Sequence, residues 1–264
     1  PEAVILYWLF QRTNIKLLRW ASAALPVFML GSLVLNWLNV YINENDLVRI
    51  VFNKGFITGI VASVALFILY GLVKKETDKS TLPKRVLTAA IVTAFISGAI
   101  EIFYQFSTHY PDLPLRIIYL QLYPFVVVIV LLQFFKNSPG FPLMKFLLTT
   151  GCFVFYLFGL APTHEVSLSL LGSGGGILFM AHWVAAICLG WLLYDLIMFF
   201  FRSKDIGWLS YRSVFTWIAA TGIILLLSVE MYHAILWTNY RDEGDWHWWE
   251  NLYYKAGLSI LWGL

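Results

Sequence analysis

Seven long apolar runs dominate this chain and leave few choices for its fold. They lie near residues 16–38, 55–73, 86–107, 115–135, 143–160, 177–200 and 213–237. Each run approaches the roughly 20 residues that cross the hydrocarbon core of a bilayer as a helix. Backbone N–H and C=O groups find no water in that core, so a spanning segment must satisfy them internally, and the alternating pattern of barrel strands is absent. The runs predict an all-α, polytopic transmembrane helical bundle.

Composition supports the same class, because only 12% of the residues are charged, against about 25% in soluble domains. Residues 3–10 resemble the tail of a preceding spanning helix, and an incomplete eighth run starts near 252. We therefore expect seven to eight spanning helices plus that tail. Residues 1–264 are interpreted as one transmembrane region, a fragment of a longer chain.

Lys and Arg residues predict the orientation of the helices. Thirteen of the eighteen flank the runs on one side, and five lie on the other. Cytoplasmic loops of membrane proteins carry the excess of positive charge, so the side with thirteen is expected to be cytoplasmic. The loops expected on the outer side are then 39–54, 108–114, 161–176 and 238–251.

A faint internal similarity relates the two halves of the chain. The segment SGAIEIFYQF (97–106) resembles LLSVEMYHAI (226–235), and two further segment pairs have a similar offset. Four spans return a chain to its starting side, so copies of a four-helix unit would be parallel repeats. This interpretation predicts repeats at 14–136 and 140–264. The alternative is chance similarity among apolar segments.

Two glutamates lie within apolar runs and are the first candidates for a ligand-binding site. Glu101 and Gln105 are four residues apart, and Glu230 and His233 are three apart, so each pair shares a helix face. Ionisable groups in a membrane usually face a bundle interior or a wet cavity. Three roles stay open: hydrogen bonds that join helices, a ligand or ion site, and proton transfer.

Metal binding has weaker support in the sequence. All five histidines lie in the expected outer half, which keeps a single divalent cation as an alternative. A di-iron bundle needs the Glu-x-x-His motif twice, but Tyr104 takes the place of His233 in the other repeat. No pair of histidines has the spacing of a zinc signature. The sequence therefore assigns no metal and no cofactor.

The loop 238–255 adds further candidate ligand-binding residues, Trp246, Trp248 and Trp249, among several carboxylates. Trp residues are enriched at membrane interfaces, which is the simpler explanation. Alternatively, the aromatic rings bind sugar rings or apolar chains. With the two intramembrane glutamates below, such loops would frame an outward-facing groove.

Three other apolar-run residues have mainly structural interpretations. Asp195 lies near the inner end of its run and is expected to reach the cytoplasmic surface or to pair with Arg202 or Lys204. Cys152 and Cys188 both lie in apolar runs and are expected to be buried small hydrophobic residues.

The C-terminal residues resemble a family of large multi-pass inner-membrane proteins of unknown function from Bacteroidota, mainly over 226–264. The matching positions are Ser228, Glu230, His233, Tyr254, Lys255, Gly257, Leu258, Ser259, Ile260, Leu261, Trp262 and Gly263. The resemblance implies a bacterial inner-membrane location and a longer chain with many more spanning helices. It implies no activity.

Three functions are compatible with these features. The first is a non-catalytic scaffold or conduit component of an envelope assembly, with an outward-facing groove for lipid or polymer. The second is a proton- or ion-coupled transporter that uses Glu101 and Glu230, and the third is an outer-face glycosyl or lipid-group transferase. The absence of catalytic motifs favours the first. The expected partners are membrane lipid and other envelope membrane proteins, and no nucleic acid.

Overall fold

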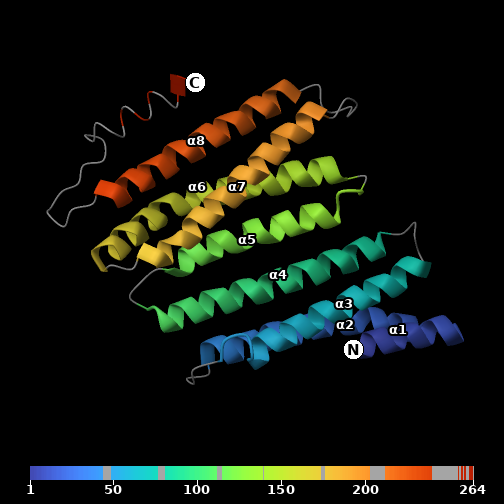
Figure 1. Ribbon diagram of the computed structural model, residues 1–264. Coiled ribbons are helices and arrows are strands. Elements are labelled where there is room, and N and C mark those ends of the chain that lie inside the picture. The colour runs from blue at the N-terminus through green and yellow to red at the C-terminus, as the bar shows by residue number, and fades with distance from the viewer. Residues whose placement is uncertain are drawn as a thin grey trace. The chain divides into compact units, whose positions relative to one another are not determined.

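The structure is a computed structural model, and it is built from helices (Figure 1). It describes residues 1–43, 49–76, 81–111, 115–138, 140–173, 176–202 and 212–239, and residues 255, 257, 259, 262 and 263. No strand occurs among these residues, which confirms the predicted all-α class. The chain divides into two compact units, unit 1 (Pro1–His109) and unit 2 (Tyr110–Leu264), which are treated separately below.

Unit 1 contains a short helix followed by three long ones. The elements are α1 (Glu2–Thr13), α2 (Lys16–Leu38), the π-helical turn η1 (Asn39–Asn43), α3 (Lys54–Glu76) and α4 (Leu82–His109). Asn14 separates α1 from α2 with a left-handed backbone (φ 54°), a conformation that asparagine tolerates at helix ends. Tyr7 and Phe10 of α1 pack on Leu69 and Val73 of α3, so α1 lies along the unit.

Unit 2 contains four long helices. They are α5 (Leu115–Phe134), α6 (Phe141–Ser173), α7 (Gly176–Arg202) and α8 (Arg212–Asn239). Together with α2, α3 and α4 they make seven helices that are long and apolar enough to cross a membrane. The chain is therefore a multi-pass membrane protein. The described residues of the predicted eighth helix, between 255 and 263, are also helical.

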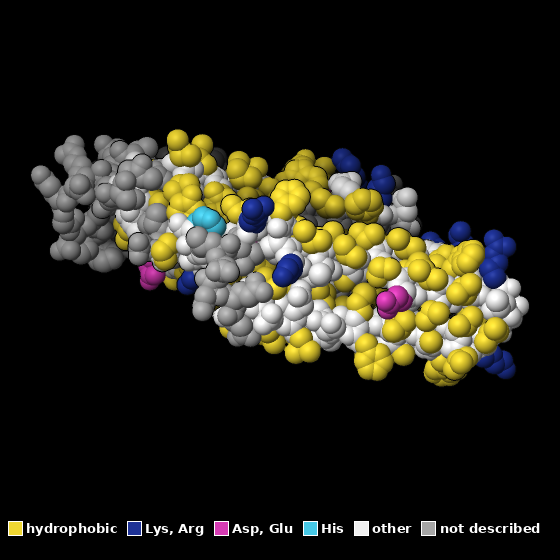
Figure 2. Space-filling model, turned by 90° about the horizontal axis from the view of Figure 1, so that it is seen from below, with side chains coloured by type: hydrophobic (Ala, Val, Ile, Leu, Met, Phe, Trp, Pro, Cys, Tyr) yellow, Lys and Arg dark blue, Asp and Glu magenta, His cyan; other side chains and the backbone are white. Residues whose placement is uncertain are grey.

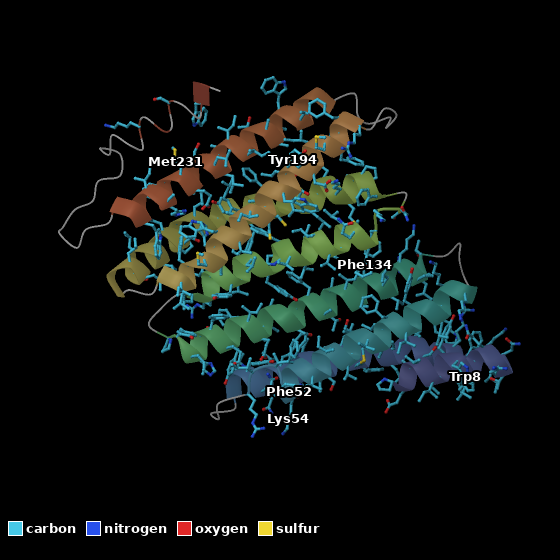
Figure 3. All side chains as sticks on the ribbon, in the orientation of Figure 1. Trp8, Phe52, Lys54, Phe134, Tyr194 and Met231 are labelled. Atoms are coloured by element: carbon cyan, nitrogen blue, oxygen red, sulfur yellow. The ribbon has the colours of Figure 1, made fainter. Side chains whose placement is uncertain are left out.

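Many large apolar side chains lie on the outside of the helices. In Figure 3, Trp8, Phe52, Phe134 and Tyr194 are labelled examples, and all four are exposed. Figure 2 shows one face on which hydrophobic side chains predominate, with a smaller number of charged side chains among them. Exposed apolar surface on this scale marks a lipid or protein contact, as expected for helices in a bilayer.

Small residues hold α3 close to its neighbours in unit 1. Gly55 and Gly59 have the four-residue spacing that lets membrane helices approach closely. The Trp37 indole donates to the Gly55 carbonyl at 3.0 Å, and the Ser63 hydroxyl donates to the Ala90 carbonyl at 2.8 Å. Gly59 lies against the Ser97 side chain of α4. Close backbone contact and short hydrogen bonds thus replace large side chains between α3 and α4.

Substitution of Gly59 by valine is expected to destabilise unit 1 by about 1–3 kcal/mol, the usual effect of overpacking. A Cβ atom at this position would lie 2.9 Å from the Ser97 Cβ, which cannot rotate away. Gly71 in the same helix has no atom within 4 Å of such a Cβ, so Gly71→Val is the matched control. Denaturation by sodium dodecyl sulfate from mild detergent micelles measures both variants. Equal midpoints for the two variants would contradict this account of the α3–α4 contact.

The helix α6 corrects one predicted boundary. The sequence interpretation ended the fifth span at 160 and placed 161–176 in an outer loop, but α6 continues through Pro162 to Ser173. The polar residues after Pro162 do not mark a loop, because two of them, Thr163 and Ser167, face the interior of unit 2. Thr163 and Ser167 are fully buried, and the Trp237 indole donates to the Ser167 hydroxyl at 3.1 Å. Bonds to α8 thus allow a polar segment to stay helical.

The partner of Asp195 is a second correction. Among the described residues its partner is Lys145 of α6, whose Nζ lies 2.6 Å from Asp195 Oδ2, and not the predicted Arg202. Lys204, the other predicted partner, lies outside the described residues. The Lys145 ammonium also lies over the Phe199 and Phe141 rings, at 4.9 and 5.6 Å from their centroids. A lysine buried to 4% exposure needs such partners. The prediction chose cations close to Asp195 in the sequence. Packing of α6 against α7 instead places the distant Lys145 beside it.

Both cysteines have the predicted structural role. Cys152 is buried in the main core of unit 2, and Cys188 is partly buried against the same core. This core also includes Phe125 and Leu132 of α5. The contacts of α5 thus place it in unit 2 with α6–α8. The proposed repeats, 14–136 and 140–264, instead place α5 in the first copy. Contact grouping does not test duplication, and the repeat stays a prediction.

Candidate functional site

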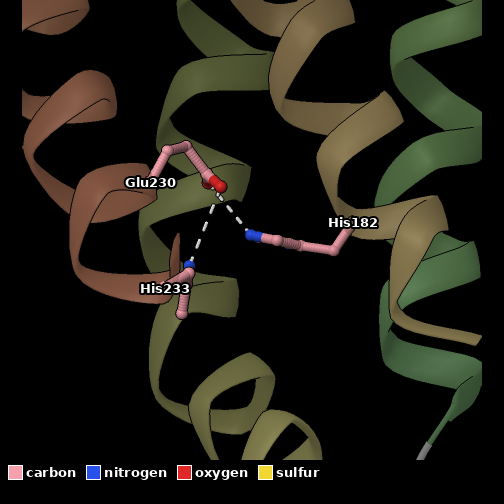
Figure 4. Close-up of side chains that lie close together, drawn as sticks. All are labelled: His182, Glu230 and His233. Carbon is pink, nitrogen blue, oxygen red and sulfur yellow. Dashed lines mark hydrogen bonds and ion pairs between the residues drawn. The ribbon is translucent and has the colours of Figure 1, made fainter. Parts of the chain in front are cut away.

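Glu230 of α8 lies at the centre of a polar cluster inside unit 2 (Figure 4). Its Oε1 accepts a hydrogen bond from the Tyr156 hydroxyl of α6 at 2.5 Å and lies 2.9 Å from His182 Nε2 of α7. Three helices therefore meet at one carboxylate oxygen. His182 is fully buried, while the Glu230 side chain keeps 17% of its surface exposed.

His233 completes the cluster from one turn further along α8. Its Nδ1 lies 3.8 Å from Glu230 Oε2, which confirms that the two residues share a helix face. That distance is too long for a hydrogen bond. One potential metal-ligating atom from each of His182, Glu230 and His233 lies within 4.8 Å of the others. The arrangement is a compact set of two imidazoles and one carboxylate.

The surrounding helices position these side chains rigidly. Leu189, Leu192 and Leu193 of α7 are buried in the core of unit 2 and fix the helix that carries His182. On α8, Leu226 belongs to the same core, one turn before Glu230. Apolar packing therefore sets the positions of α7 and α8, and the polar residues point between them.

Aromatic rings enclose the cluster. The Phe179 ring lies 4.9 Å from the His182 ring and 5.7 Å from the His233 ring, centroid to centroid, and it stacks on Trp237 at 5.1 Å. The Tyr232 hydroxyl lies 3.2 Å from His164 Nδ1 beside the cluster. Such a shell limits water access to the imidazoles and strengthens electrostatic interactions among them.

Three buried atoms of the cluster have no hydrogen-bond partner among the described residues: His182 Nδ1, Glu230 Oε2 and His233 Nδ1. The large majority of buried side-chain polar atoms in proteins have a partner. Leaving one unsatisfied costs about 1–3 kcal/mol. A bound cation or water between Glu230 Oε2 and His233 Nδ1 would satisfy both atoms at once.

Glu101 has a different environment in unit 1, because hydrogen bonds already satisfy both carboxylate oxygens. Oε2 accepts from the Tyr41 hydroxyl and from the Asn53 amide, each at 2.7 Å. Oε1 accepts from the Val51 backbone N–H at 2.8 Å and from the Gln105 amide at 2.9 Å. The Gln105 bond confirms that these two residues share a helix face. Val51 has a positive φ of 64°, which is strained for a β-branched residue, and its bond to Glu101 helps to hold it.

The two glutamates nevertheless have related partners. In unit 1 a tyrosine from η1, after α2, and an asparagine just before α3 bind Glu101 of α4. In unit 2 a tyrosine from α6 and a histidine from α7 bind Glu230 of α8. In each unit a glutamate of the last long helix is thus bound by two side chains from earlier in the unit. The repeat itself stays a prediction, and the two sets of partners differ, because an asparagine in unit 1 takes the place of an imidazole in unit 2.

The remaining predicted site residues have separate outcomes. Trp246, Trp248 and Trp249 lie outside the described residues. The shared outward groove of Glu101 and Glu230 stays a prediction, and so does the ligand-binding role of these residues. Among the resemblance positions, the Trp262 indole donates to the Ser228 hydroxyl at 3.2 Å.

The sequence analysis missed two members of the cluster, Tyr156 and His182. His182 was noted only as one of five histidines in the expected outer half, and Tyr156 carried no signal. Comparison with protein-family models, with curated proteins and with solved structures finds no match. The geometry of the site is therefore the basis for the functional inference.

Proposed function

We propose that this multi-pass membrane protein binds a divalent transition-metal ion, of the class of Zn²⁺, at His182, Glu230 and His233. The convergence of three ligand atoms within 4.8 Å inside a membrane-spanning unit carries the proposal. Ligands of a tetrahedral zinc ion lie about 3.3 Å apart, because each metal bond is roughly 2.0–2.2 Å long. The 3.8 Å between Glu230 Oε2 and His233 Nδ1 is close to that separation, so small side-chain rotations would complete the site.

The donor set selects the class of ion. Imidazole nitrogen suits zinc, copper, iron and nickel, whereas magnesium and calcium prefer oxygen ligands. Two histidines and one glutamate form a set that zinc uses when it keeps one position open. The Tyr156 hydroxyl, bonded to Glu230, would act as an outer-shell partner that orients the carboxylate.

The bound ion fits a non-catalytic inner-membrane scaffold or conduit component best. It would join α7 to α8 and, through Tyr156, to α6, and so fix the three helices. Glu101 supports the same structural role, because its hydrogen bonds join α4 to the segments before α3. The outer groove for lipid or polymer remains part of this proposal, with the tryptophan loop as its expected wall.

Metal content measured by mass spectrometry and calorimetric titration with Zn²⁺ tests the proposal on purified protein in detergent. We expect one ion per chain and a loss of affinity of about 100-fold or more for His182→Ala, Glu230→Gln and His233→Ala, because each removes a direct ligand. Tyr156→Phe removes only an outer-shell bond and should cost about 10- to 100-fold.

His164→Ala is the matched control for this titration. His164 lies in unit 2 and contacts Tyr232 rather than Glu230, so its removal should lower the affinity far less than removal of a proposed ligand. Absence of stoichiometric Zn²⁺ and Co²⁺ binding by the unsubstituted protein would contradict the proposal. Equal binding by the control and the three ligand variants would do so as well.

Ion-coupled transport is a second candidate, and the Tyr156–Glu230–His182 chain of short contacts favours it. A carboxylate that is partly exposed and linked to three helices can exchange a proton or an ion as those helices move. Zn²⁺ uptake into proteoliposomes under a pH gradient tests this role, with Glu230→Gln expected to abolish uptake. The transferase hypothesis depends on the Trp246–Trp249 loop and stays a prediction.

A further inference from the structure

We infer that unit 1 binds one anionic phospholipid of the inner leaflet in a groove between α2 and α4. The groove has a volume of about 630 Å³, within the range of small-molecule sites. Residues from both helices line it: Leu30, Leu33, Val34, Trp37, Thr81, Lys84, Arg85, Thr88, Ala89, Val92, Thr93 and Ile96. This site is separate from the proposed metal site in unit 2.

The two ends of the groove differ in chemistry. Lys84, Arg85 and Thr88 lie at the start of α4 and Thr81 lies just before it, and the remaining wall is almost entirely apolar. Lys84 and Arg85 are exposed, and neither forms an ion pair with an acidic side chain among the described residues. Two cations with nearby hydroxyl groups suit a phosphate. The apolar wall suits an acyl chain.

The length of the groove matches one leaflet. Lys84 and Ile96 are twelve positions apart on α4, which is about 18 Å along a helix axis. Half of a hydrocarbon core about 30 Å thick is roughly 15 Å. With Lys84 at the headgroup level, Ile96 would therefore lie near the middle of the bilayer. The groove thus offers a charged end and an apolar end at the separation that a single phospholipid needs.

The deep end of the groove is fixed by the packing of unit 1. Trp37 and Leu33 are buried against Ala62 of α3, and the Trp37 indole is held by its bond to Gly55. Val34, Val92 and Ile96 remain exposed. A rigid floor with exposed walls favours insertion of a chain rather than collapse of the groove. The expected cytoplasmic position of Lys84 and Arg85 agrees with the negative charge of that leaflet.

Native mass spectrometry of the protein in detergent, titrated with phosphatidylglycerol or phosphatidylcholine, tests the inference. We expect preferential retention of one phosphatidylglycerol. The double variant Lys84→Gln/Arg85→Gln should weaken it by about ten- to thirtyfold, since each surface cation contributes about a factor of five. Lys74→Gln/Lys75→Gln is the matched control, because it removes the same charge from exposed residues at the end of α3, outside the groove.

A second variant tests the apolar wall while leaving both charges in place. Ala89→Phe fills the middle of the groove and should also weaken phosphatidylglycerol retention by at least tenfold. Equal losses for the two charge variants would indicate a non-specific basic surface and overturn the inference. Unchanged retention in Ala89→Phe, or no preference for phosphatidylglycerol in the unsubstituted protein, would overturn it too. Circular dichroism confirms that each variant is folded before titration.

Discussion

Replacement of Asp195 by asparagine is expected to lower the free energy of unfolding by about 3 kcal/mol. Breaking a buried ion pair from one side usually costs about 3–5 kcal/mol, because the other charge stays buried without its partner. Lys145 is that charge, with only 5% of its side chain exposed and its Nζ 2.6 Å from Asp195 Oδ2. Asp195 is 36% exposed, so water reaches the site and the effect lies at the lower end of the range.

The double variant Lys145→Met/Asp195→Leu tests whether the loss of stability comes from the unpaired Lys145 charge rather than from loss of the ion pair itself. Replacing both members of a buried ion pair with apolar residues is often neutral or stabilising. The Phe141 and Phe199 rings, which lie beside the Lys145 ammonium, provide apolar contacts for the uncharged side chain that replaces it. Lys136→Met, at an exposed position after α5, is the control for loss of a cation and should change stability by less than about 0.5 kcal/mol. Unfolding in mixed micelles measures all three. A double variant as unstable as Asp195→Asn would refute the role of the unpaired ammonium.

Helix positions were predictable from the sequence because bilayer thickness sets the length of each apolar run. The predicted fifth span ended too early, because Pro162 and the polar residues after it resemble a loop in the sequence. The burial of Thr163 and Ser167 becomes evident only in the packed unit, where the Trp237 indole of α8 donates to Ser167. Without this neighbouring helix the buried Ser167 hydroxyl would lose its bond to Trp237. Tertiary contacts therefore decided a boundary that local preference assigned differently.

The candidate site was likewise predictable only in part, where the residues lie close together in the sequence. Spacing along α8 was sufficient to pair Glu230 with His233, because residues three apart share a helix face. His182 and Tyr156 are 48 and 74 residues away from Glu230, and no local pattern connects them. Glu101 and Glu230 looked alike as isolated carboxylates in apolar runs. Their partners distinguish them, since four hydrogen-bond donors satisfy Glu101 while one oxygen of Glu230 has no hydrogen-bond partner among the described residues.

Glu101→Leu is therefore expected to destabilise unit 1 by about 3–5 kcal/mol without affecting Zn²⁺ binding in unit 2. The change removes the acceptor of four donors, and a hydrogen bond to a charged group contributes about 1.5–3 kcal/mol. Some of the four donors will bind water near the membrane surface instead. The expected loss of stability is therefore smaller than the sum of four separate hydrogen-bond contributions. Glu165→Gln at an exposed position of α6 is the control and should be nearly neutral. Thermal unfolding in detergent and zinc titration of the same samples provide the two measurements.

A double-mutant cycle with Tyr41 assigns the effect to the hydrogen bonds themselves. Tyr41→Phe alone should cost about 1.5–3 kcal/mol, because its hydroxyl donates to Glu101 Oε2 at 2.7 Å. In the Glu101→Leu background the same change should cost much less, since its charged acceptor is already gone. The Asn53 side-chain oxygen lies 3.0 Å from the Tyr41 hydroxyl, so a small residual cost is expected. Equal costs in the two backgrounds would show that the carboxylate does not hold the tyrosine, and Glu101 would then be free to bind a ligand like Glu230.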